Sequence, residues 1–396
     1  EDPGEEEPEQ TRSISLKVIA PKKNQAITVS PLAINGTVKD SAGIGNVKFR
    51  LNGESFSDAE LLFVRKGKSS NWTASASLRP GTNILEVVAT NLDGKSASVT
   101  VPFYYHVASP LTILTTLNGT PVDNPEVGMV TYKTSLHDGD PAHLFIGRSY
   151  TLKATPGSAQ YILTNWTATW EGQETPVLIG ENNASCVITM QSNMVVRANF
   201  IENPFYVFDG EYNGLFADTN GVAFHNAGYI RLNVTKKQKF TAKLFVDGNT
   251  VSLSGSLGID GIGSATTKKR MKEFDKPEIT LNVELDFVNG DIARGTVAEG
   301  SNWSVPFLAH RKTWSKENAA DSYTNAYTMI IPNGDQGPEG SGYSTFKVND
   351  AGKLSVSGSV ADGQSLKQST VLSRNGDLPL FVPLYKGTYT DSNSKV

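Results

Sequence analysis

The sequence contains a single cysteine, Cys186, among 396 residues. One thiol cannot form an intrachain disulfide, and it cannot build the cysteine clusters that hold structural zinc. No apolar run reaches the roughly 18 residues that a membrane-spanning helix requires, so membrane insertion is not expected. Stability must therefore come from packed hydrophobic cores, for which 38% of the residues are hydrophobic.

Charge is also scarce. Charged residues make up 19% of the chain, against about a quarter in an average soluble protein. Lys and Arg number 36 and Asp and Glu number 40, which gives a formal net charge of −4. Proteins that bind nucleic acid usually present a basic surface, because they neutralise phosphates. Nucleic acid is therefore not an expected partner.

Helical periodicity is nearly absent, whereas alternation of apolar and polar residues recurs along the chain. Residues 13–18 and 279–286 are two clear examples. A period of two places one face of a strand in a core and the other in water. Asn-Gly and Asp-Gly dipeptides separate the alternating runs, and these residues accept the left-handed backbone of tight hairpin turns. The sequence therefore predicts an all-β chain built from sandwiches or barrels.

The length predicts two to four domains, at roughly 100–200 residues per domain. Residues 1–10, EDPGEEEPEQ, include five Glu and no large apolar side chain. We expect this segment to be a disordered acidic leader, because it cannot bury enough surface to offset the entropy of ordering. The first residue is not Met, as expected where a signal peptide has been removed or where the chain is a piece of a longer one.

Residues 11–107 carry a characteristic order of motifs. A strand and turn at 45–53 precede Trp72, which is followed by the motif LRPGTN starting at Leu78 and by an alternating strand at 84–90. This order resembles the bacterial immunoglobulin-like domains of secreted and surface proteins. The resemblance implies a seven-stranded sandwich without a disulfide, with Trp72 and Leu78 in or near its core. It implies no catalytic residues.

Residues 108–202 show a second pattern. The segment GRSYTLKATP at 147–156 is followed by Tyr161 and Trp166, and the unit closes with VVRANF at 195–200. This pattern resembles the B-repeats of internalin-type surface proteins, which are small β modules of extracellular bacterial proteins. The resemblance implies a compact β module with Trp166 in its core.

Residues 203–396 contain an internal repeat. The segment 228–234 recurs as 342–348, and the offset of 114 residues becomes 115 after the third strand. A bulge or a longer turn would produce such a shift. We expect the copies, about 203–315 and 322–396, to form one β-barrel-like region, because one small meander leaves its edges exposed. The second copy is expected to be incomplete. The repeat resembles segments of large secreted bacterial proteins.

The densest group of candidate metal ligands is a short polar segment. Two imidazoles and two carboxylates lie within seven residues: His137, Asp138, Asp140 and His143. Such side chains can hold a divalent ion. The intervening Gly139 and Pro141 disfavour a convergent arrangement, so a polar turn is the simpler interpretation. We expect neither a metal nor a cofactor.

Catalytic motifs are absent from the sequence. It has no GxSxG nucleophile elbow and no phosphate-binding P-loop. Glu284 and Asp286 share one face of a predicted strand, where an exposed charged face is a simpler interpretation than an acid–base pair. Cys186 lies in a strand-like run and is expected to be a buried thiol. The sequence thus predicts a protein that is not an enzyme.

Aromatic side chains are the candidates for ligand binding, because sugar-binding surfaces stack pyranose rings on them. Trp166 and Trp170 are four residues apart and would face the same side of a strand. Trp166 and Trp303 are expected in cores. Trp170 and Trp314 remain as candidate binding residues.

The predicted function is that of a non-catalytic extracellular or cell-surface protein with a structural, spacer or adhesive role. Its candidate partners are other copies of itself and neighbouring domains of the same polypeptide. One alternative is a carbohydrate-binding accessory region of a secreted polysaccharide-degrading enzyme, with an extracellular polysaccharide as partner. A second is a hydrolase with its site in residues 203–396. The module types support this function by analogy of fold.

Overall fold

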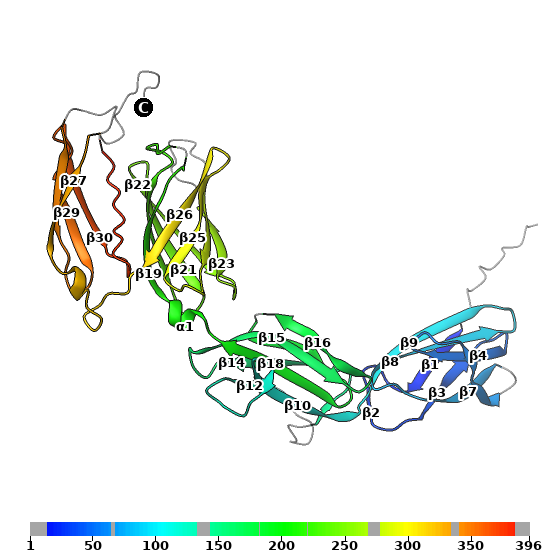
Figure 1. Cartoon of the computed structure of the whole chain (residues 1–396). Helices are drawn as coiled ribbons and strands as arrows, with labels where there is room; N and C mark the ends of the chain where they lie inside the picture. Colours follow the sequence, from blue (N-terminus) through cyan, green and yellow to red (C-terminus); the bar gives the residue numbers. More distant parts are fainter. Residues whose placement is uncertain are drawn as a thin grey trace, which may run out of the picture. The chain divides into compact units, whose positions relative to one another are not determined.

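The computed structural model describes residues 14–64, 68–132, 143–181, 183–219, 221–267, 278–333 and 340–384. These residues form 30 strands, one four-residue α-helix and one 3-10 turn, so the prediction of an all-β chain is confirmed (Figure 1). No helix among them has the length and apolar character needed to cross a membrane. The chain divides into two compact units, 1–158 with 163–201 and 159–162 with 202–396.

The first unit begins with a sandwich of two sheets, ordered β1-β3-β7-β6 and β2-β9-β8-β4-β5. The pairs are antiparallel except for β2 with β9. The strands are β1 Ser15–Ala20, β2 Ala26–Ile27, β3 Leu32–Lys39, β4 Ile44–Leu51, β5 Ser57–Asp58, β6 Glu60–Val64, β7 Ser69–Ala76, β8 Gly81–Asn91 and β9 Ser96–Tyr105.

The core of this sandwich forms around Trp72 on β7, which is completely buried. Leu78 is also buried, so the predicted positions of both residues are confirmed. The neighbouring strand β3 carries Gly36 directly opposite Trp72. A Cβ atom at Gly36 would lie 2.0 Å from the backbone oxygen of Lys17 and 2.4 Å from the Trp72 ring. Glycine is required here because the indole fills the space of a side chain.

The first unit continues with two further sheets. One has the order β11-β10-β18-β15-β16, with β13 also paired to β10, and the other has the order β12-β14-β17. The strands are β10 Ala108–Leu117, β11 Thr120–Pro121, β12 Met129–Tyr132, β13 His143–Phe145, β14 Ser149–Thr155, β15 Tyr161–Trp170, β16 Gln173–Glu181, β17 Ser185–Thr189 and β18 Met194–Glu202.

Trp166 on β15 is completely buried, as expected. Its indole Nε1 donates a hydrogen bond to the backbone oxygen of Asn183 at 2.9 Å, which satisfies the only polar atom of the side chain. Cys186 is buried nearby, and desolvation raises the pKa of its thiol. A buried thiol with a raised pKa is unreactive, because the thiolate is the nucleophile.

The second unit contains a closed barrel in which consecutive strands pair from β19 to β26 and β26 pairs back to β19. A short helix, α1 Phe205–Phe208, lies at one end (Figure 1). The strands are β19 Gly210–Phe216, β20 Gly228–Val234, β21 Lys239–Val246, β22 Asn249–Leu257, β23 Ile262–Thr266, β24 Ile279–Leu285, β25 Ile292–Glu299 and β26 Trp303–Arg311.

Apolar side chains fill the barrel. Each of the eight strands contributes buried residues to one continuous core, and Phe205 of α1 joins it from the end. Eight strands form a barrel just wide enough for side chains to fill. Inside, the Tyr212 hydroxyl donates a hydrogen bond to the backbone oxygen of Phe208 at 2.7 Å. Burial raises the pKa of Tyr212 to about 12.

A four-stranded sheet follows the barrel in the order β27-β28-β29-β30. Its strands are β27 Ala326–Ile331, β28 Gly342–Lys347, β29 Lys353–Ser359 and β30 Ser365–Val371, and the 3-10 turn η1 Asp321–Tyr323 precedes them. A small core forms on one face, where Trp314, Tyr323 and the partly buried Leu378 and Leu380 cover the sheet.

The barrel corrects one prediction. A barrel is present in residues 203–396, but the two repeat copies do not build it together. The strands of the first copy close the ring alone, and those of the second copy form the separate sheet. The physical reason is that the first copy already supplies eight strands, the number at which a barrel closes around a filled interior.

We expect Gly36→Val to destabilise the N-terminal sandwich by about 3 kcal/mol, because the new side chain must displace the Trp72 ring or the β1 backbone. Gly53→Ala is the control. A Cβ atom at Gly53 would meet no other atom within 4 Å, and the positive φ of this residue alone costs about 1 kcal/mol. Native-state hydrogen exchange of the β3 and β7 amides measures both losses. Equal losses for the two variants would contradict this account of Gly36.

The raised pKa of Tyr212 predicts a loss of barrel stability at alkaline pH. Between about pH 10 and 12 the unfolded chain releases the phenol proton while the folded barrel retains it, so the free energy of unfolding falls as the pH rises. The loss is about 1.4 kcal/mol for each pKa unit. Tyr212→Phe should lower stability at pH 7 by about 1 kcal/mol and reduce the alkaline loss. Urea unfolding across pH 7–11 tests this, and parallel pH profiles would refute it.

Candidate binding groove on the outer wall of the barrel

The β30 strand and the segment after it cover part of the outer barrel wall. Along β20, Ile230 and Leu232 point into the barrel, so Tyr229 and Arg231 point outward. Tyr229 is nevertheless only 2% exposed. Its hydroxyl donates a hydrogen bond to Oδ1 of Asn213 at 2.6 Å. Burial raises the pKa of Tyr229, and hydrogen bonding with Thr370 partly offsets this effect.

An ion cluster also joins the barrel wall to the loop after β30. Asp291 accepts a hydrogen bond from Nε of Arg311 at 2.8 Å, and its second oxygen accepts one from Nη1 of Arg374 at 3.2 Å. The Asp291 carboxylate is mostly shielded from water, with 16% of its side chain exposed. Arg374, which joins the loop to this cluster, is 69% exposed, so its ion pair with Asp291 contributes little to the placement of the sheet.

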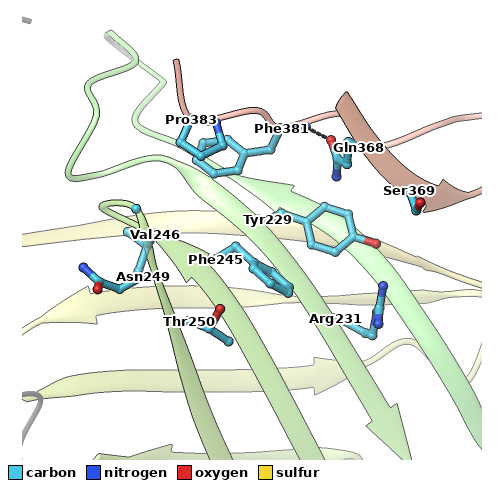
Figure 2. Close-up of a pocket in the computed structure, with 11 residues that line it drawn as sticks. Tyr229, Arg231, Phe245, Val246, Asn249, Thr250, Gln368, Ser369, Phe381 and Pro383 are labelled. Carbon is cyan, nitrogen blue, oxygen red and sulfur yellow. Dashed lines mark hydrogen bonds between the residues drawn. The ribbon is translucent and has the colours of Figure 1, made fainter. Parts of the chain in front are cut away.

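A first hollow of about 180 Å³ opens between the barrel wall and the segment after β30. Figure 2 shows Phe381 and Gln368 above it and Tyr229, Phe245 and Arg231 on the barrel strands below. The backbone N–H of Phe381 donates a hydrogen bond to Oε1 of Gln368 at 2.6 Å, which holds the cover in place. The other lining residues are Val246, Gly248, Asn249, Thr250, Ser369 and Pro383.

A second hollow of about 710 Å³ adjoins the first and shares Arg231 and Ser369 with it. Four cationic side chains and one carboxylate line it: Arg231, Lys312, Lys347, Lys353 and Glu211. Nε of Arg231 lies 4.0 Å from Oε1 of Glu211. That Nε atom is buried and finds no hydrogen-bond acceptor in the described part of the chain. The groove formed by the two hollows is thus cationic, although the chain carries a net charge of −4.

The groove has the chemistry of a binding surface. Aromatic rings and side-chain amides lie in the first hollow, and cations lie in the second. Such a combination suits a polar or anionic ligand that presents one flat face. A glycosidase of the usual kind requires two carboxylates across the scissile bond. The lining residues of both hollows include one, Glu211.

The two tryptophans proposed from the sequence lie outside this groove and in different units. Trp314 packs edge-on against Tyr323, with ring centroids 5.9 Å apart, and its Nε1 donates a hydrogen bond to the backbone oxygen of Ser373 at 2.9 Å. Its polar atom is therefore already satisfied. Trp170 ends β15 and is half-buried. Ligand binding at either residue stays a prediction.

The metal-like cluster falls mostly outside the described residues. His137, Asp138 and Asp140 lie in the undescribed segment 133–142, and His143 is an exposed residue at the start of β13. Within the described ranges no group of three His, Cys, Asp or Glu side chains is placed to hold a metal ion. The expectation for residues 137–143 stays a prediction.

Glu284 and Asp286 form an ion cluster with Arg294 of the neighbouring strand β25, in which Glu284 and Arg294 are partly exposed and the Asp286 side chain is 9% exposed. The Asn289 side chain and backbone also donate hydrogen bonds to Asp286, and these bonds lower the pKa of that carboxyl. A general acid needs a raised pKa, so Asp286 has the character of a turn-stabilising residue.

The groove residues were not found from the sequence, although one signal was present. Tyr229 and Phe245 lie directly opposite each other on β20 and β21, and both occupy outward positions. Two aromatic residues at positions where alternation predicts polar side chains indicate a covered or binding surface. Phe381 and Gln368 come from a segment more than a hundred residues away, and no spacing in the sequence connects them to this wall.

The solved structures that match this chain include three with low TM-scores. Dimeric latent PorU from Porphyromonas gingivalis is 9% identical over 61% of this chain and 19% of its own, with a TM-score of 0.20. SGBP-B of a Bacteroides ovatus mixed-linkage glucan utilization locus, solved with a heptasaccharide, is 11% identical over 91% and 70%, with a TM-score of 0.18. A tetra-tandem repeat from the extending region of a large adhesion protein is 13% identical over 90% and 98%, with a TM-score of 0.20.

The chain spans about a fifth of the length of PorU. At these TM-scores the structural similarities carry no argument about function. No curated protein matches the chain. The sequence match to a family is confined to the first sandwich, whose strands β1 to β9 span Ser15 to Tyr105. Residues 15–101 match the bacterial Ig domain family, and this part of the chain is a bacterial Ig-like domain.

Proposed function

We propose that this chain is a non-catalytic structural and adhesive part of a bacterial surface or secreted protein. The bacterial Ig-like domain at residues 15–101 supports this placement, because such domains commonly serve as spacers between functional parts. The barrel and the sheet β27–β30 fit the same role, since each packs a hydrophobic core of its own.

The observation that carries the proposal is the filled interior of the β19–β26 barrel. All eight strands direct apolar side chains into one core, and Phe205 packs against Phe287 at the end, with ring centroids 5.2 Å apart. Barrels that carry or transform a ligand keep a cavity inside or at the mouth. A barrel packed like a domain core is suited to bear load and present its outer wall.

A second candidate function is carbohydrate binding in the groove. The observation that favours it is the combination of Phe245 and Phe381 with the amides of Asn249 and Gln368 in the first hollow. Aromatic faces stack on sugar rings, and side-chain amides are suited to hydroxyl groups. The adjoining Lys312, Lys347 and Lys353 favour polysaccharides that carry carboxylate or sulfate groups.

A surface location predicts that antibodies raised against this chain label intact cells of the bacterium that produces it. Protease added to intact cells should remove the label, because the protein would lie outside the membrane barrier. An antibody against a cytoplasmic protein is the control and should label only permeabilised cells. Labelling of this chain that also requires permeabilisation would refute the proposal.

The carbohydrate-binding candidate predicts that the purified chain binds immobilised acidic polysaccharide and that added salt weakens the binding. Phe381→Ala should weaken it about tenfold, because a stacking surface is lost. Tyr343→Ala is a matched control, since Tyr343 is an exposed aromatic residue on β28 that does not line the groove. A glycan array gives the measurement. Equal binding by both variants would exclude this groove as the site.

A further inference from the structure

The four-stranded sheet repeats the pairing register of the first four barrel strands. Tyr229 pairs with Phe245 between β20 and β21, and 114 residues later Tyr343 pairs with Ser359 between β28 and β29. The β19–β20 pairing recurs in β27–β28, with each β27 residue 115 positions after its β19 counterpart and each β28 residue 114 positions after its β20 counterpart. The β21–β22 pairing recurs in β29–β30 in the same way, with an offset of 114 residues from β21 to β29 and of 115 residues from β22 to β30.

Hydrogen bonds outside the ladders repeat as well. The Tyr212 hydroxyl donates to the backbone oxygen of Phe208, and the Tyr327 hydroxyl donates to that of Tyr323, 115 residues later in both cases. The N–H of Leu257 donates to the backbone oxygen of Gln238 at 2.8 Å, and Leu372 donates to Gly352 at the same distance. The acceptors Gln238 and Gly352 both have a positive φ, 59° and 65°. The sheet β27–β30 is thus the first half of the barrel built a second time.

The two copies differ at one edge. In the barrel, the outer edge of β19 pairs with β26. The counterpart of β19 is β27, and no strand of the described residues pairs with its outer edge. Natural sheet edges are usually protected by Lys, Pro, a bulge or a covering segment. The β27 sequence AYTMII has no charge and no Pro, and Ile330 is 70% exposed.

The inner face is only partly covered on the β27 side. Three fully buried barrel residues correspond to three half-buried ones in the sheet: Tyr212 and Tyr327, Phe216 and Ile331, and Leu232 and Phe346. Leu354 and Val356 on β29 are buried, as are their barrel counterparts. The incomplete cover is therefore concentrated beside the unpaired edge.

The hydrogen-bond pattern identifies the β27 groups that face this edge. Val348 donates to the backbone oxygen of Asn325, so residues 325, 327, 329 and 331 use their backbone groups on β28. The backbone groups of Thr328 and Ile330 therefore point to the open edge. The barrel gives the same result independently. Lys312 of the β26 segment donates to Glu211, whose counterpart 115 residues later is Ala326.

We propose that β27 accepts an antiparallel β-strand from another polypeptide, with apolar side chains at alternate positions like those of β26. Val305, Phe307 and Ala309 are the inward residues of β26. Side chains of this kind on the donated strand would cover Tyr327, Ile331 and Phe346, while its backbone pairs with the open edge. This is strand addition to a sheet edge, and it is a binding activity separate from the groove and from the proposed structural role.

One position distinguishes the accepting strand from β19. A Cβ atom at Gly214 would lie 2.5 Å from Cα of Ala309 and would collide with the backbone oxygen of Leu308. The counterpart of Gly214 is Met329. A donated strand therefore cannot copy the approach of β26 at this point, and it must be held further out.

The probe for this proposal is a fluorescent peptide with the sequence of residues 302–312, NWSVPFLAHRK. We expect saturable one-to-one binding to the full chain by anisotropy, with slower hydrogen exchange at the Thr328 and Ile330 amides. Met329→Gly, which restores the residue found in the first copy, should bind severalfold more tightly. Thr328→Pro should weaken binding about tenfold, because it removes a donor at the open edge but none from the β28 ladder.

Two controls separate edge pairing from other effects. Thr328→Ala keeps the N–H group and should bind within about twofold of the unmodified chain. A peptide with Leu308→Pro lacks an N–H group that faces the accepting strand, and it should lose binding even if Thr328→Pro fails to fold. Thermal melting by circular dichroism verifies the folding of each variant.

Three results would overturn the proposal. The first is no saturable binding by either the unmodified chain or Met329→Gly. The second is binding that both proline substitutions leave unchanged. The third is a dimer in sedimentation whose β27 amides are protected without peptide, because a second copy of the chain would then occupy the edge in place of a strand of β26 chemistry.

Discussion

Every strand in this chain has backbone N–H and C=O groups along both edges, and the need to pair them determines the architecture. The barrel meets the need by closing on itself, because β26 returns to β19, with its shortest ladder of two positions between β22 and β23. The Ig-like sandwich meets it with short outer strands such as β2 and β5, each of two residues. The sheet β27–β30 meets it least, since its first strand is six residues long and neutral.

Alternation in the sequence was sufficient to predict the strands and much of the packing. The family resemblances, and not the alternation, placed Trp72 and Trp166 in cores, and both are completely buried. The shift from 114 to 115 residues predicted a bulge or a longer turn. Two residues separate the paired Val246 and Asn249 between β21 and β22, and one more lies between Val360 and Gln364 in the second copy.

Alternation could not predict which strands form the barrel or where the groove lies. Alternation tells which face of a strand is buried, but not how many strands are needed before a sheet closes on itself. The groove joins Tyr229 and Phe245 to Phe381 across more than a hundred residues, and only the packing of β30 against the barrel wall brings them together. Trp314 was a reasonable binding candidate by residue type, yet its indole hydrogen bond is made within the chain.

Because the barrel interior is filled with apolar side chains, polar and charged side chains are found on its outer wall and at the sheet edges. Tyr229 and Asn213 are polar residues on the outer wall, and they are buried because the second copy covers them. The sheet β27–β30 and the segment after it thus cover part of the outer barrel wall. The cationic groove lies between this cover and the wall.

The matching registers also create a problem of chain assembly. A nascent polypeptide contains two segments, 210–257 and 326–371, that can offer the same ladder to β23 and β26. If segment 326–371 paired with β23 and β26, its apolar side chains would still be buried, but the barrel would contain the wrong copy. Gly214 disfavours this error, because a Cβ atom at this position would collide with the Leu308 backbone, so β26 would have to lie further from Met329 in the competing segment. The close approach at Gly214 therefore favours the first copy over the second as the partner of β26.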